Sequence, residues 1–98
     1  MSAVGDIVSA YSNDVAADGT LDIKPAGTEE WVIHNIYCGD DAEIYWEDGT
    51  NTVKVHSITG AGWITGIFVH VNATYYMSIK NVSGGAADLG YDGVITRL

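Results

Sequence analysis

Short apolar runs that alternate with polar residues fill this chain, and turn residues interrupt them about every ten positions. The segment Thr74–Lys80 shows the alternation. Its residues Tyr75, Met77 and Ile79 fall on one face of an extended strand, and polar residues fall on the other. The segment Glu30–Cys38 is apolar on both faces, which predicts a strand in the middle of a sheet.

Two further patterns predict strands with defined ends. The pair Asp48-Gly49 stands between the strand-like runs Ala42–Glu47 and Asn51–Ser57, which is typical of a hairpin turn. In the run Trp63–Val71, the residues Trp63, Ile67, Val69 and Val71 form an apolar face, which predicts one strand.

These patterns predict about eight strands and no helix, since no segment keeps a helical period of apolar residues. We therefore expect one all-β domain over residues 1–98, an antiparallel β-sandwich of the jelly-roll kind. An immunoglobulin-like sandwich is the alternative. Residues 1–11 are expected to form an arm or an edge strand that contacts neighbouring molecules.

The charge is strongly acidic: thirteen Asp and Glu face four Lys and Arg, a formal net charge of −9 over 98 residues. Such a surface repels phosphate backbones, so we do not expect nucleic acid as a partner. No apolar run is long enough to span a membrane, and the first residues lack the basic start of a signal peptide.

Candidate chemistry is sparse, and we expect a protein that is not an enzyme and carries no metal or cofactor. The three histidines have no ligand-like spacing. The acidic stretches Asp40–Glu43 and Glu47–Asn51 lack the calcium-loop pattern and are more simply turns. The single cysteine, Cys38, is expected to be a small core residue at a strand end, which also excludes an internal disulfide.

Aromatic residues are the remaining signal, because Tyr and Trp supply large contact areas at interfaces. We expect Trp31 and Trp63 to lie in the core. The residues expected at an interface come from the N-terminal segment and from mixed strand faces: Ser2, Val4, Ile7, Tyr11, Tyr37, Tyr45, Trp46 and Tyr76.

Two segments, Lys24–Ile36 and Asp88–Ile95, resemble stretches of small virion proteins of tailed bacteriophages. The resemblance is to capsid decoration, or cement, proteins. It implies a small β-sandwich, often a homotrimer, that is made in the host cytoplasm and binds the outer surface of the major capsid protein shell. It brings no catalytic residue with it.

The resulting functional expectation is a structural virion protein that stabilises a capsid. The alternative is a carbohydrate- or receptor-binding module of a phage head or tail, which exposed aromatics beside acidic loops would favour.

Overall fold

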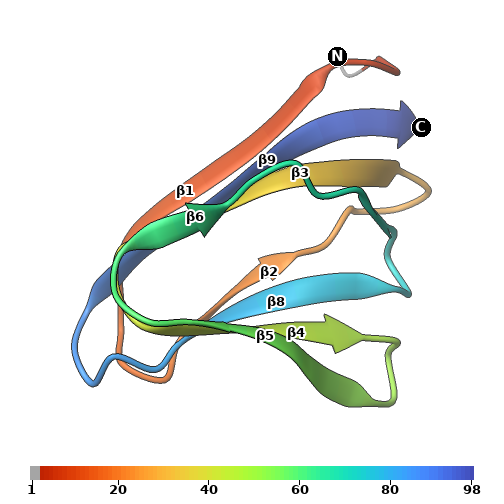
Figure 1. Ribbon diagram of the computed structural model, residues 1–98. Coiled ribbons are helices and arrows are strands. Elements are labelled where there is room, and N and C mark those ends of the chain that lie inside the picture. Colours follow the sequence, from red (N-terminus) through yellow and green to blue (C-terminus); the bar gives the residue numbers. More distant parts are fainter. Residues whose placement is uncertain (1–2) are drawn as a thin grey trace.

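The computed structural model describes residues 3–98 and is all-β (Figure 1). Its strands form two antiparallel sheets. In chain order they are β1 (Ile7–Val15), β2 (Thr20–Ile23), β3 (Glu30–Cys38), β4 (Ala42–Glu47), β5 (Thr52–Ile58), β6 (Gly62–Ile64), β7 (Val69–Val71), β8 (Tyr76–Asn81) and β9 (Ala87–Arg97).

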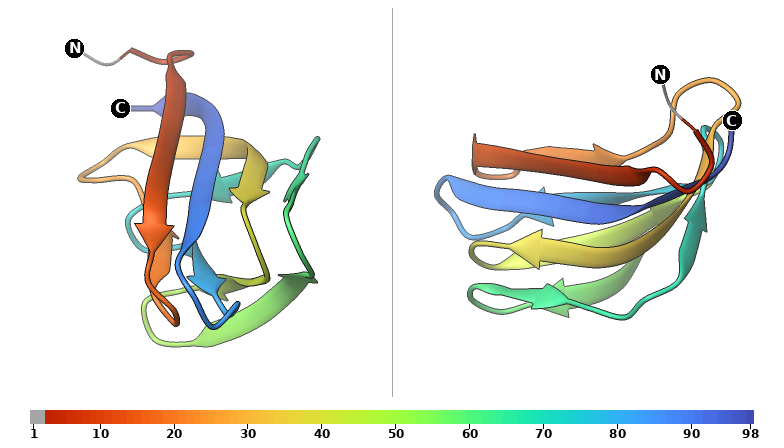
Figure 2. Two further views of the ribbon diagram at one scale, coloured as in Figure 1. Left: turned by 90° about the vertical axis from the view of Figure 1, so that its left-hand side faces the viewer. Right: turned by 90° about the horizontal axis from the view of Figure 1, so that it is seen from above.

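One sheet, which we call sheet A, has the order β1-β9-β3-β6. The strand β7 pairs with another part of β3, along the same edge as β6. Sheet B has the order β2-β8-β4-β5. Figure 2 (right) shows β1, β9, β3 and β6 side by side in that order. When β6 and β7 are counted as one interrupted strand, two four-stranded sheets remain, which is the jelly-roll architecture. The predicted antiparallel sandwich is therefore confirmed.

The predicted single strand over Trp63–Val71 is wrong, and its division accounts for the ninth strand. Residues 65–68 leave the sheet, and Gly66 takes a left-handed φ of 69°. The partner strand β3 carries an irregularity between Ile33 and Asn35, and the Ile67 N–H bonds to the carbonyl of His34 at this point. Opposite a bulge the regular ladder is disrupted, so β6 and β7 pair with separate parts of β3.

The core lies between the sheets and is mainly aliphatic, with Ile33, Ile44, Ile79 and Leu89 essentially inaccessible to solvent. The strand β3 pairs with β9 on one side and with β6 and β7 on the other, which confirms its predicted central place. The predicted hairpin between β4 and β5 is also observed, with Asp48 accepting hydrogen bonds from the N–H groups of Thr50 and Asn51.

The described part of the N-terminal segment is bonded to β9. The Gly5 N–H donates to Ile95 and the Ile95 N–H donates to Asp6, and β1 then forms the edge of sheet A. From Ile7 onward this segment is an edge strand and not a free arm.

Candidate binding surface

The outer face of sheet B balances its charges. Strand alternation points Asp22, Glu43 and Glu47 outward, and all three lysines of the chain reach the same face. Lys54 forms an ion pair with Glu43 at 3.3 Å, and Lys24 lies 4.7 Å from the ring centre of Tyr76. The third lysine is Lys80, which pairs across the sheet with Glu43 and Thr20.

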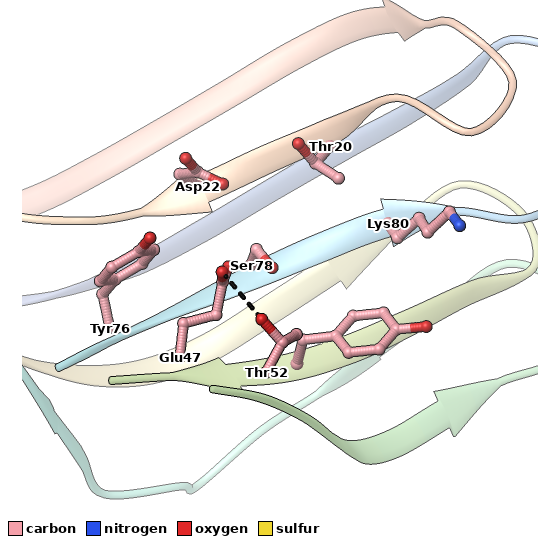
Figure 3. A pocket seen from close by; sticks show the side chains of 8 residues that line it. Thr20, Asp22, Glu47, Thr52, Tyr76, Ser78 and Lys80 are labelled. Carbon is pink, nitrogen blue, oxygen red and sulfur yellow. Dashed lines mark hydrogen bonds between the residues drawn. The ribbon is translucent and has the colours of Figure 1, made fainter. Parts of the chain in front are cut away.

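This face carries an open, shallow depression of about 450 Å³ (Figure 3). Eight residues line it: Thr20, Asp22, Tyr45, Glu47, Thr52, Tyr76, Ser78 and Lys80. Figure 3 shows the hydroxyl of Thr52 bonded to Glu47, at 3.3 Å. Tyr45 also donates to Glu43 of the same strand. The depression is open and does not enclose a ligand as a deep pocket does.

The negative charge of the molecule therefore lies elsewhere. The outer face of sheet B carries three carboxylates and three lysines, and Glu30 pairs with Arg97 at 3.3 Å, so the other nine of the thirteen carboxylates lie outside these charge-balanced places. Five of these nine lie at the end of the sandwich where β1 turns into β2 and β3 into β4. This acidic end comprises Asp14, Asp18, Asp40, Asp41 and Asp88.

Hydrogen bonds hold the turns of the acidic end together. Asp88 accepts the N–H of Asp14 at 3.0 Å, and Asp41 accepts the N–H of Gly60 at 2.5 Å. Figure 2 (left) faces this end and shows the connections from β1, β3, β5 and β8 grouped there. The carboxylates support the turns, as the sequence predicted for Asp40–Glu43, while their charges stay uncompensated.

The outer face of sheet A carries a row of aromatic side chains at right angles to its strands. Tyr11 of β1 and Tyr37 of β3 both pair with Gly90 of β9, and Tyr37 pairs in turn with Trp63 of β6. We call Tyr11, Tyr37 and Trp63 the aromatic row. The rings of Tyr37 and Trp63 are stacked, with centroids 5.4 Å apart and an interplanar angle of 23°.

Two carboxylates of β9 flank this row. The Tyr11 hydroxyl donates to Asp88 at 3.0 Å, and Asp92 accepts bonds from the Tyr37 hydroxyl and from the Asn35 amide. The hydrogen bond to Asp88 raises the pKa of Tyr11 above its ordinary value, and the bond to Asp92 does the same to the pKa of Tyr37. Both tyrosines therefore stay protonated and act as hydrogen-bond donors to these carboxylates.

The structure scatters the residues that the sequence placed at one interface. Val4, Ile7 and Tyr11 are exposed beside or on β1, while Tyr37 lies half-buried on the same sheet. The others belong to sheet B, where Tyr45 and Tyr76 point outward and Trp46 points inward against the core. Ser2 lies outside the described residues.

The assignment of the tryptophans from sequence was partly wrong. Trp31 packs against the core as expected, but Trp63 is 61% exposed. Because side chains of a strand alternate, a prediction that cannot place the strand register cannot tell which face Trp63 takes. Sequence reasoning also missed Asp88 and Asp92, although their two-residue spacing around Gly90 already puts them on one strand face.

No group of three or more His, Cys, Asp or Glu within 3–98 could hold a metal ion. Cys38 is buried at the end of β3, as predicted, and burial raises the pKa of its thiol to about 11. Such a thiol is a poor nucleophile. Within the same residues the structure has no helix long and apolar enough to cross a membrane.

No protein-family model matches this chain, and no curated protein matches it. Among solved structures it is similar to the core of Drosophila NLP, a nucleoplasmin core domain, with a TM-score of 0.55 and 8% sequence identity. The match covers 93% of this chain and 98% of that one. At this identity the likeness shows a shared fold, a β-sandwich of the jelly-roll kind.

This comparison contradicts the function expected from the sequence. The Drosophila NLP core forms pentamers and binds histones. It is neither a capsid cement protein nor a carbohydrate- or receptor-binding module of a phage. The expected trimer on a major capsid protein is wrong by the same finding. The resemblance behind those expectations rested on two short segments, which here form parts of the β2–β3 region and of β9. Strand and turn composition of that kind recurs across proteins of unrelated function.

Proposed function

We propose that this domain is a self-associating, non-catalytic acidic module that binds a basic protein partner. The observation that carries the proposal is the uncompensated negative charge, nine carboxylates of which five gather at the acidic end. A surface of one sign attracts a partner of the opposite sign and speeds its association. The likeness to the Drosophila NLP core supports the proposal, because that protein combines this fold with histone binding.

Self-association is supported by two exposed apolar surfaces on opposite sides of the sandwich. On one side Val4 and Ile7 are 63% and 80% exposed. On the other, Val53 and Val55 of the edge strand β5 are 55% and 53% exposed. Contact between two different patches of successive copies closes into a ring when the rotation permits. The NLP core, which forms pentamers, is a precedent for such a ring on this fold.

The side with β5 also opens into an apolar cleft between the edges of the two sheets. The cleft has a volume of about 190 Å³. Its lining is Ile36, Ile44, Val55, His56, Ile64, Ile67, Val69 and Met77. Apolar surface of this kind at a sheet edge is what a neighbouring copy would cover.

Binding of labelled core histones, followed by fluorescence anisotropy, tests the proposed partner class. We expect binding that weakens steeply as salt rises from about 0.01 M to about 0.15 M, because the Debye length falls from about 30 Å to about 8 Å. An acidic protein of similar size is the control ligand and is expected not to bind. Absence of histone binding at the lower salt concentration would refute the proposed function.

Light scattering after gel filtration tests self-association, since the single chain has a mass of 10.4 kDa. We expect the wild type to have a discrete multiple of that mass. The variant Val55→Asp should have a mass closer to that of the monomer, because it places a charge in the cleft. The control is Thr59→Asp, which adds the same charge at an exposed turn position outside the cleft. A wild-type monomer at micromolar concentration, or equal masses for the two variants, would count against the ring.

A further inference from the structure

We propose that the aromatic row on sheet A binds arginine side chains of the basic partner. The inference rests on the proposed function, since it locates the partner's binding surface. It adds a site, Tyr11, Tyr37 and Trp63 between Asp88 and Asp92, and a preferred ligand group, the guanidinium.

The row is an exposed platform because β9 has no side chain at its centre. A Cβ atom on Gly90 would lie 3.0 Å from the ring of Tyr11 and 3.3 Å from the ring of Tyr37. Both tyrosine rings therefore lie over Gly90, and Trp63 continues the surface by stacking on Tyr37. Tyr11 and Trp63 are each 61% exposed, so both ends of the platform face solvent.

The charges around the platform are negative and unpaired. The two ion pairs within residues 3–98 are Lys54–Glu43 and Arg97–Glu30, and neither involves Asp88 or Asp92. These two carboxylates accept bonds from neutral donors, which orient them without cancelling their charge. All three lysines of the chain lie on the opposite sheet.

A flat aromatic surface between carboxylates matches the chemistry of arginine. The guanidinium is planar, stacks on aromatic faces and donates hydrogen bonds from its edge to a carboxylate. An ammonium group is a compact, strongly hydrated charge and uses such a platform less well. The surface should therefore prefer arginine to lysine at equal peptide charge.

The dimensions suit an extended basic segment. Asp88 and Asp92 are four residues apart on β9, which corresponds to about 13 Å along the strand. From β1 to β6 the row crosses three strand spacings, or about 14 Å at about 4.8 Å each. An extended peptide of about four residues covers either distance. Adjacent arginines of such a peptide can reach the platform and the acidic end together, since Asp88 belongs to both.

The test compares two fluorescent nonapeptides, one of arginine and one of lysine, by anisotropy against the full chain. We expect the arginine peptide to bind more tightly, and Trp63→Ala to weaken it about three- to tenfold, the scale of a cation–π contact. Asp92→Asn should weaken the binding of both peptides, because it removes the charge. Its amide oxygen can still accept the hydrogen bond from Tyr37. The matched control is Phe68→Ala, which removes an aromatic side chain that is 75% exposed but lies outside the row.

The outcomes separate this inference from the proposed function. If wild type binds core histones but Trp63→Ala and Asp92→Asn bind the arginine peptide as wild type does, the site is refuted and the proposed function stands. Equal affinity of the wild type for the arginine and lysine peptides also refutes the site. If Trp63→Ala changes the mass by light scattering and leaves peptide affinity unchanged, the row is a contact between copies of this chain and the inference fails. If wild type binds no basic ligand, the proposed function itself fails.

Discussion

Replacing Asn81 by alanine should destabilise the fold more than any other single polar truncation in the described chain. Asn81 is fully buried at the end of β8. Its amide nitrogen lies 2.8 Å from the carbonyl oxygen of Val15 and 2.6 Å from that of Gly85. Its amide oxygen accepts from the N–H and the hydroxyl of Ser83, at 3.0 and 2.7 Å. One side chain thus connects the end of β1 to the β8–β9 loop.

The expected magnitude follows from these bonds. A carboxamide has two N–H donors and two acceptor positions, so about four of the contacts act as full hydrogen bonds, each worth about 1 kcal/mol net. In Asn81→Ala water can reach Ser83 and the exposed Gly85, which recovers part of that loss. The Val15 carbonyl also loses its partner. We therefore expect a loss of about 3 kcal/mol in the free energy of unfolding.

Urea denaturation followed by tryptophan fluorescence measures this loss, at one fixed protein concentration because self-association adds to apparent stability. The matched control is Asn72→Ala. The amide oxygen of Asn72 likewise accepts two hydrogen bonds, here from the N–H groups of Thr74 and Tyr75, but those residues are exposed and water replaces the amide. We expect the control to lose no more than about 1 kcal/mol. Equal losses for the two variants would refute the reasoning that burial sets the cost.

Three other measurements probe the packing, the thiol and the acid sensitivity of the fold. Gly93→Ala should prevent folding or cost more than about 4 kcal/mol, because its Cβ would lie 2.1 Å from the carbonyl oxygen of Val32, whereas Gly62→Ala, with open space at its Cβ, should change stability by less than about 0.5 kcal/mol. Cys38 should not react with a thiol reagent at pH 8 while the protein is folded, since burial raises its pKa to about 11, and denaturant should release one reactive thiol per chain; fast reaction of the native protein would contradict the buried position. Asp48 accepts backbone N–H bonds that lower its pKa, so its contribution to stability is present above its unfolded pKa and is lost as pH falls below about 4. The free energies of unfolding of wild type and Asp48→Asn should therefore converge below that pH. A difference between them that stays constant down to pH 2 would contradict this.

Several elements were predictable because their signals are local. The Asp48-Gly49 turn and the two-sided apolar run Glu30–Cys38 depend on neighbouring residues, and both are observed. The break at residues 65–68 was not predictable. It lies opposite an irregularity in β3, a strand about thirty positions earlier in the chain, and the lapse of the apolar face at Thr65-Gly66 does not by itself identify that partner.

The candidate site shows the same limit. Tyr11 and Tyr37 were expected at an interface from their residue type and strand position, while Trp63 was assigned to the core. Their alignment in one row depends on the pairing of four strands, since a shift of one residue in any of them would turn its side chain to the other face.

The sequence by itself determined the all-β class, the acidic charge and the absence of an internal disulfide, because composition and short-range periodicity carry that information. The tertiary structure alone decided where the charge lies and which aromatics are exposed. Those properties are set by strand order and register, which join residues far apart in the chain through hydrogen bonds and core packing.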